Sequence, residues 1–180
     1  MEGEETPSRM PDVLFISGLI DKLEASYNID KRQIYANGMS NGGGMAFVLS
    51  CTLSSRIAAV GMVSAGLDPD WSWCTDKKPV PVIAFHGTAD PVCPYNGGPS
   101  KLAGGTLPNV PEFYAKWSRR NQCGPNGITS VIAADVTRLQ YTGCANDADV
   151  SFYTIKGEGH QWPGVGGSRR NGWSGPTTAA

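Results

Sequence analysis

The sequence lacks an excess of charge of either sign. Its 180 residues contain 15 Lys and Arg against 16 Asp and Glu, which gives a formal net charge of -1. The basic residues are scattered, whereas a nucleic-acid interface needs them concentrated on one face. We therefore expect no nucleic-acid partner.

Long apolar runs are also missing. A membrane-spanning helix needs about 20 consecutive apolar residues, and the apolar stretches here are far shorter. The first twelve residues, MEGEETPSRMPD, are acidic and polar, which is not typical of a signal peptide. We expect no membrane partner and no signal peptide in this chain, and the sequence does not indicate an oligomeric state.

Residues that commonly bind metals are scarce. The chain has two histidines, His86 and His160, and none of its cysteines forms a close C-x-x-C pair. A zinc site is therefore not expected, and neither is a cofactor.

Structural disulfides explain the five cysteines better than a metal site does. Cys51 with Cys74 would tie a helix end to a later loop, and Cys123 with Cys144 would close a glycine-rich excursion. The alternative is that all five cysteines, including Cys93, are free thiols. If the disulfides form, they indicate an oxidising compartment.

The segments that are present alternate between helical and extended patterns. Apolar residues at helical spacing over 12–27, behind Asp12 as a candidate N-cap, predict an amphipathic helix. A short strand over 33–37 then leads into Ser40 and a helix that ends near Cys51. The local order is strand, sharp turn and helix.

The remaining segments predict one α/β domain with a mostly parallel central sheet. Segments 57–66 and 80–87 are nearly all apolar, as expected of strands buried on both faces of a parallel sheet. A Gly/Pro-rich loop is expected over 88–106. A helix over 109–121 and strands over 136–143 and 149–157 follow.

Gly38-Met39-Ser40-Asn41-Gly42 fits the pattern G-x-S-x-G. On a strained strand-to-helix turn, side chains in place of the two glycines would collide with the backbone. The Ser40 hydroxyl would then be exposed, and the Asn41 N–H at the helix start could donate to an oxyanion. A glycine-rich turn without chemistry remains the alternative for the pentapeptide alone.

A serine nucleophile needs a general base, and the two histidines are the candidates. His160 stands in GEGHQWPG, directly after the last predicted strand. His86 ends a buried strand, which is typical of a hydrogen-bonded structural histidine. We therefore assign the base to His160.

A carboxylate must orient that base. Asp90 follows strand 80–87 and is the first candidate, whereas Asp68 and Asp70 after the preceding strand are the alternatives. With Asp90, the order along the chain is Ser40, Asp90, His160, which is the order of the α/β-hydrolase fold.

Four segments together resemble the secreted polyhydroxybutyrate depolymerase-like esterases, a group that includes the feruloyl and acetyl xylan esterases of carbohydrate esterase family 1. They cover 12–47, 57–67, 79–95 and 157–164, within a match over about 12–176. The resemblance implies an extracellular carboxylic-ester hydrolase with its triad on Ser40, Asp90 and His160. It also implies that Cys123 and Cys144 are bridged.

The resemblance further indicates where an ester substrate would lie. Trp162 matches the family's aromatic wall beside the histidine, and Met39 and Asn41 flank the nucleophile. Tyr95 and Trp162 could stack an aromatic acyl group. Feruloyl or acetyl esters of plant polysaccharides, or polyhydroxyalkanoate-type esters, are the expected substrates.

The chain departs from the family pattern at both ends. Residues 12–176 are expected to form a partial catalytic domain flanked by tails over 1–11 and 177–180. Because 39 residues precede Ser40, we expect early strands, one oxyanion donor and the final helix of a longer secreted parent to be absent. Loss of one such donor costs about 10²- to 10³-fold in rate.

A weak or inactive fragment that binds carbohydrate or polymer is the alternative function. Its stacking surfaces would be four tryptophans, Trp71, Trp73, Trp162 and Trp173. Tryptophans in such loops also fit ordinary core packing, so the sequence leaves both interpretations open.

Overall fold

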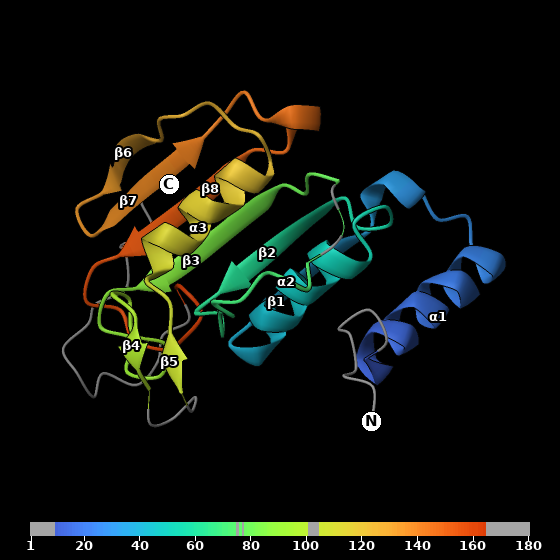
Figure 1. Cartoon of the computed structure of the whole chain (residues 1–180), viewed down its shortest axis with the longest axis horizontal. Coiled ribbons are helices and arrows are strands. Elements are labelled where there is room, and N and C mark those ends of the chain that lie inside the picture. The colour runs from blue at the N-terminus through green and yellow to red at the C-terminus, as the bar shows by residue number, and fades with distance from the viewer. Residues whose placement is uncertain (1–9, 75, 77, 101–104, 165–180) are drawn as a thin grey trace.

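A computed structural model describes residues 10–74, 76, 78–100 and 105–164 (Figure 1). Three α-helices, eight strands and two short 3-10 helices lie within these ranges. In chain order they are α1 (Pro11–Ser26), η2 (Lys31–Gln33), β1 (Tyr35–Met39), α2 (Asn41–Thr52), β2 (Ala59–Val63), β3 (Val82–Gly87), β4 (Gly98–Pro99), β5 (Thr106–Leu107), α3 (Val110–Arg120), β6 (Ile128–Ala133), β7 (Val136–Tyr141), η3 (Ala145–Asp147) and β8 (Val150–Ile155).

The main sheet has six strands in the order β1-β2-β3-β8-β7-β6. β1, β2, β3 and β8 run parallel to one another, and β7 and β6 complete the sheet as antiparallel strands. The mostly parallel sheet expected from the sequence is therefore present, with β1 at its edge. Because parallel strands end on the same side, residues that follow β1, β3 and β8 share one edge of the sheet.

Helices α2 and α3 pack on the same face of the sheet (Figure 1). The Phe47 ring on α2 lies 5.1 Å from the Phe113 ring and 5.5 Å from the Trp117 ring, both on α3. Burial of aromatic rings of this size is a large share of a small domain's hydrophobic stabilisation. This aromatic cluster fixes both helices to the sheet.

Burial along β3 alternates rather than being continuous. Val82 and Ala84 are buried, whereas Ile83 between them is 44% exposed. The prediction that this strand is buried on both faces is therefore wrong. Among the described residues the helices α2 and α3 cover one face only, and the apolar run in the sequence does not reveal which face has a partner.

Helix α1 begins one residue earlier than predicted. Met10 occupies the N-cap position without a side-chain cap, and Pro11 is the first helical residue. The predicted N-cap, Asp12, lies in the first turn instead. Proline suits this position because its missing N–H has no intrahelical partner there.

The apolar stripe on α1 is only partly buried. Val13 and Ile20 lie in the core, whereas Leu19 and Leu23 are about 40% exposed, at 40% and 39%. The predicted amphipathic face thus packs through half of its width.

Polar contacts complete the attachment of α1. Arg56, which follows α2, pairs with Asp21 at 2.7 Å and Glu24 at 3.4 Å and donates to the Ser17 carbonyl oxygen.

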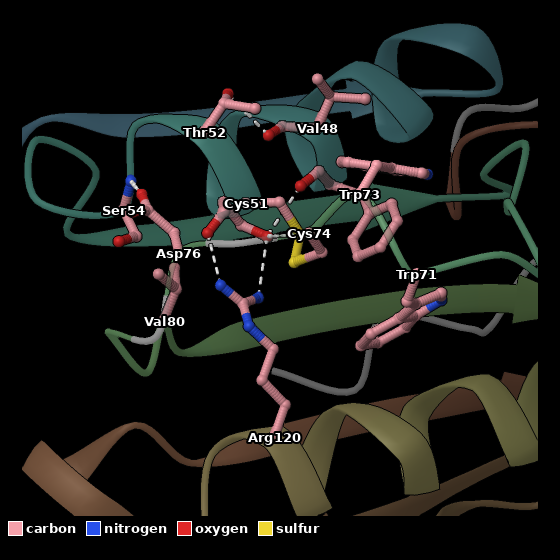
Figure 2. The surroundings of a disulfide bond; sticks show 12 residues. Val48, Cys51, Thr52, Ser54, Trp71, Trp73, Cys74, Asp76, Val80 and Arg120 are labelled. Atoms are coloured by element: carbon pink, nitrogen blue, oxygen red, sulfur yellow. Dashed lines mark hydrogen bonds between the residues drawn. A yellow bond between two sulfur atoms is a disulfide. The ribbon is translucent and has the colours of Figure 1, made fainter. Parts of the chain in front are cut away.

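Two disulfides join the cysteines that the sequence paired, Cys51 with Cys74 and Cys123 with Cys144. Cys51 lies at the end of α2 and Cys74 in the long loop between β2 and β3, so the first disulfide ties that loop to the helix. Figure 2 shows Arg120 of α3 reaching toward the same place, where its guanidinium donates to the side chain and carbonyl oxygen of Ser50. The fifth cysteine, Cys93, is free and buried.

Strand β6 was not predicted. Its apolar residues Ile128, Val131 and Ile132 are all exposed, at 51% or more, so they do not alternate in the way that marks a half-buried strand. Within the loop expected over 88–106, β4 lies at Gly98–Pro99 and pairs with β5 at Thr106–Leu107. The tail predicted over 177–180 and Trp173 lie outside the described residues.

Candidate active site

Ser40 occupies the junction between β1 and α2 in a conformation that is rare for serine. Its φ of 56° and ψ of -122° place it in the left-handed region, which costs a non-glycine residue about 1–3 kcal/mol. Ser40 is also the N-cap of α2, yet its side chain makes no capping hydrogen bond. A serine at this position usually uses its hydroxyl for the cap, so the hydroxyl is left available.

Backbone hydrogen bonds hold the turn in place. Ser40 N–H donates to the Val63 carbonyl oxygen at 2.9 Å, and the Ser40 carbonyl oxygen accepts from Gly44 and Gly66, both at 3.0 Å. The turn is thereby fixed to the end of β2. The neighbouring Asn41 N–H lies at the first position of α2, where helix N–H groups have no intrahelical acceptor.

The glycines around Ser40 differ in what they allow. A Cβ on Gly38 would lie 2.5 Å from the Gly42 carbonyl oxygen, and one on Gly43 would lie 2.7 Å from the Ala65 Cβ. A Cβ on Gly42 would meet nothing within 4 Å. The prediction is therefore correct for Gly38 and wrong for Gly42, and the close approach of α2 to the end of β2 requires Gly43 instead.

Asp90 and His160 form a hydrogen-bonded pair at the edge where Ser40 lies. His160 Nδ1 lies 2.9 Å from Asp90 Oδ2 and 3.1 Å from Oδ1. Asp90 follows β3 and is 5% exposed, and its Oδ1 also accepts from the Val92 and Cys93 N–H groups. Because a carboxylate without a proton only accepts hydrogen bonds, the His160 proton belongs on Nδ1 and leaves Nε2 as the base.

The alternative carboxylates are engaged elsewhere. Asp68 Oδ2 accepts from the Trp73 indole, and Asp70 accepts from the N–H and hydroxyl of Ser72. Of the three candidates, Asp90 is the one that contacts His160. Within the described ranges no hydrogen bond joins the Ser40 hydroxyl to His160, and such bonds often tighten only when substrate binds.

His86 and Cys93 lie behind Asp90. His86 is buried, as expected of a structural histidine, and its Nε2 lies 2.8 Å from the Cys93 carbonyl oxygen. Burial lowers the pKa of His86. Burial, together with the Asp90 carboxylate, raises the pKa of Cys93 to about 11, so the thiol stays protonated at neutral pH and is a poor nucleophile.

Glu158 is a buried carboxyl group that the sequence reasoning missed. It is 2% exposed and precedes His160 by two residues; its Oε1 accepts from Gln161 at 3.0 Å, and its Oε2 has no partner among the described residues. Burial raises the pKa of Glu158, the Gln161 hydrogen bond opposes that change, and the Asp135 carboxylate adds to it. An acidic residue between two glycines beside a candidate base was the available signal.

Replacement of Glu158 by Gln is expected to remove a pH-dependent loss of stability. Because the folded form holds its proton to higher pH than the unfolded chain does, the free energy of unfolding falls as pH rises above about 4.5. Urea unfolding of both proteins at about pH 4.5 and about pH 7.5 measures this. The wild type should lose more stability than Glu158→Gln between the two values, and parallel losses would contradict the assignment.

The predicted substrate-binding residues occupy different environments. Met39 ends β1 and is half-buried, whereas Asn41 is exposed. Tyr95 is half-buried against the core, and its hydroxyl lies 2.9 Å from Thr154 Oγ1. Trp162, two residues after His160, is 43% exposed. Trp162 is therefore the aromatic side chain with the more accessible face.

Two of the tryptophans proposed as stacking surfaces belong to the core. The Trp71 and Trp73 rings lie 4.7 Å and 5.4 Å from the Phe47 ring. Lys116 lies over the Trp71 ring at 4.7 Å. Both tryptophans are half-buried against the core, which favours the packing interpretation for both.

The described ranges lack two other features. They contain no group of three or more His, Cys, Asp or Glu residues that could hold a metal ion. They also contain no helix with the length and apolarity required to cross a membrane.

The sequence is similar to those of known esterases. No protein-family model matches the sequence. Feruloyl esterase B of Piromyces equi is 30% identical over 168 residues, which cover 90% of this chain and 30% of that protein. Feruloyl esterase C of Emericella nidulans is 31% identical over 161 residues, which cover 87% of this chain and 53% of that protein.

A solved structure supports the fold. An acetyl xylan esterase from Aspergillus awamori matches with a TM-score of 0.55 and 16% identity, over 82% of this chain and 61% of the other. The predicted α/β-hydrolase class is confirmed, with α2 and α3 both on one face of the sheet. The comparisons do not extend to polyhydroxybutyrate depolymerases, so that part of the resemblance stays a prediction.

The chain spans between about a third and about half of the length of these two feruloyl esterases. The expected relationship to feruloyl esterases is confirmed over that length. By sequence, the chain is thus related to the feruloyl esterases over the matched part of their length.

Proposed function

We propose that the chain carries the catalytic residues of a carboxylic-ester hydrolase. Ser40 attacks the ester carbonyl, His160 takes the hydroxyl proton at Nε2 and returns it to the leaving alcohol, and Asp90 orients His160. Water then hydrolyses the acyl-enzyme by the same proton transfers. The Asn41 N–H stabilises the oxyanion that forms at each step.

One observation carries this proposal. The His160 ring donates to the buried Asp90 carboxylate at the sheet edge where the strained Ser40 turn lies. Asp90 fixes the ring with its proton on Nδ1, so Nε2 can accept a proton. The names of the relatives support an ester as the substrate.

Feruloyl or acetyl esters of plant polysaccharides are the proposed substrates, with polyhydroxyalkanoate-type esters as the alternative. The exposed face of Trp162 beside His160 suits an aromatic acyl group. The proposed catalytic domain is 12–176. Its two disulfides fit an extracellular protein.

A fluorophosphonate probe tests the proposal directly. The activated serine displaces fluoride from the probe and forms a phosphonate ester, so we expect one adduct, mapped by mass spectrometry to Ser40 and absent from Ser40→Ala. Ser55→Ala, which changes an exposed serine, is the control and should be labelled like the wild type. A folded sample without adduct, or with an adduct at another serine, would contradict the proposal.

A substrate panel then ranks the esters. Methyl ferulate, acetylated xylan and hydroxyalkanoate oligomers are compared under the same conditions. We expect the highest kcat/KM for the ferulate if Trp162 stacks its ring, and Trp162→Ala should reduce that preference.

A further inference from the structure

His86 is a second histidine beside Asp90, and the proposed reaction gives it no role. Its side chain is 1% exposed. Nε2 lies 2.8 Å from the Cys93 carbonyl oxygen and 3.5 Å from Asp90 Oδ2. A carbonyl oxygen cannot donate a hydrogen bond, so Nε2 carries the proton and His86 is the donor.

The other ring nitrogen of His86, Nδ1, is buried and makes no comparable hydrogen bond in the described part of the chain. The titratable groups around the ring are Asp90, Cys93, His160 and Tyr95, whose ring centroid is 6.2 Å away. Because burial lowers the pKa of His86, the ring is neutral at pH 7 and does not compete with His160 as a cation.

Cys93 links His86 to Asp90 through two hydrogen bonds of its backbone. Its N–H donates to Asp90 Oδ1 at 2.8 Å, and its carbonyl oxygen accepts from His86 at 2.8 Å. His86 belongs to β3, which pairs with strands on both sides. These two hydrogen bonds therefore hold the turn that carries Asp90 against β3, a central strand of the sheet.

We propose that His86 is a positioning residue that holds the turn 90–93, and with it the Asp90 carboxylate, in the orientation that accepts a hydrogen bond from His160 Nδ1–H. The inference rests on the proposed function, because the oriented base is the His160 of that reaction. The short bond to Cys93, rather than the longer approach to Asp90, carries the effect. His86 acts through the position of the carboxylate and touches no reacting atom.

Three substitutions separate the two ring nitrogens. Gln places an N–H close to the position of Nε2, Asn reaches only the position of Nδ1, and Leu supplies no donor. We expect His86→Asn and His86→Leu to lower kcat by about 10- to 10²-fold with little change in KM, because small misplacements of catalytic groups have effects of that size. His86→Gln should restore most of kcat.

The tautomer of His160 provides a measurement that does not depend on ester hydrolysis. With two histidines in the chain, each His86 variant labelled with ¹⁵N-histidine gives ring signals from His160 alone. His160 should carry its ring proton on Nδ1 in the wild type and in His86→Gln, because Asp90 accepts a hydrogen bond from that nitrogen. In His86→Asn and His86→Leu, a fraction with the proton on Nε2 should appear.

The outcomes distinguish this proposal from the proposed function. If folded His86→Asn and His86→Leu keep His160 entirely in the Nδ1–H form, His86 does not position Asp90. The same conclusion follows if Gln fails to restore what Asn and Leu remove. A chain that fails to react with the fluorophosphonate contradicts the esterase proposal, whereas the tautomer result still decides the role of His86.

Discussion

Asp90→Asn is expected to lower kcat by about 10⁴-fold while leaving the fold intact. Asp90 Oδ1 accepts two backbone N–H groups, from Val92 and Cys93. The amide oxygen of Asn can take over both bonds, which directs the amide NH₂ toward His160. An NH₂ group cannot accept a hydrogen bond from Nδ1–H but can donate one to an unprotonated Nδ1. The ring should therefore adopt the tautomer with its proton on Nε2.

That tautomer cannot act as the base for Ser40. Nε2 would then carry a proton and have no lone pair to accept another. The effect should appear as a lower kcat with little change in KM, because the geometry of the substrate site is unchanged.

Active-site titration followed by steady-state hydrolysis of methyl ferulate measures the effect. Asp70→Asn is the matched control, since Asp70 is an exposed carboxylate of an adjacent loop that accepts from Ser72. We expect the control to stay within about threefold of the wild type, as surface substitutions usually have small effects. A mild effect of Asp90→Asn with a severe one of Asp70→Asn would reverse the assignment of the acid.

Gly87→Ala is expected to disrupt both stability and activity. A Cβ on Gly87 would overlap the Glu158 carbonyl oxygen and lie 2.5 Å from its carbonyl carbon and 2.9 Å from the Gly159 carbonyl oxygen. All of these atoms are backbone, so no side-chain rotation can relieve the overlap. The segment that carries His160 has to move away from the end of β3.

The size of the effect follows from two separate terms. Forced shifts in a packed region cost about 1–3 kcal/mol of unfolding free energy. The hydrogen bond from Ala89 N–H to the Glu158 carbonyl oxygen, which is 2.9 Å long in this structure, would be distorted by the same shift. A displacement of His160 by about 1 Å should reduce kcat by about 10²-fold.

The next glycine supplies the control for this prediction. A Cβ on Gly159 would meet nothing within 4 Å, so Gly159→Ala should retain both stability and kcat. Urea unfolding and ester hydrolysis of the two variants are compared side by side. If Gly87→Ala and Gly159→Ala behave alike, the packing of the His160 segment against β3 is not what positions the base.

Much of the candidate site was predictable because it depends on where strands end. Ser40, Asp90 and His160 each follow a strand of a parallel sheet, and such ends share one edge. The sequence favoured Asp90 but left Asp68 and Asp70 as alternatives. Which carboxylate reaches the histidine depends on loop conformation, which local residue types do not determine.

The supporting residues were harder to predict for the same reason. The hydrogen bond from His86 to Cys93 uses a backbone carbonyl oxygen. Every residue type has such an oxygen, so the residue type at position 93 does not predict the bond. The roles of Gly42 and Gly43 were confused because a G-G-G run does not show which position faces β2. Glu158 was missed because a charged residue in a loop is usually exposed.

The fold was predictable where hydrophobic patterns match the pairing of elements. The strand over 80–87 and the helix over 109–121 are examples, since β3 and α3 lie within one residue or two of those limits. Strand β6 could not be found in this way, because its apolar side chains face solvent. The start of α1 also depends on Pro11 rather than on the polar cap that the sequence favoured.

The conformation of Ser40 lowers the stability of the fold. The residue combines a positive φ with an unused helix cap, and each of these lowers stability relative to what another residue could provide at the same place. A glycine there would adopt the backbone angles at little cost. Selection for stability alone would therefore remove Ser40, the proposed nucleophile, and its presence indicates that this position was shaped by a demand other than folding.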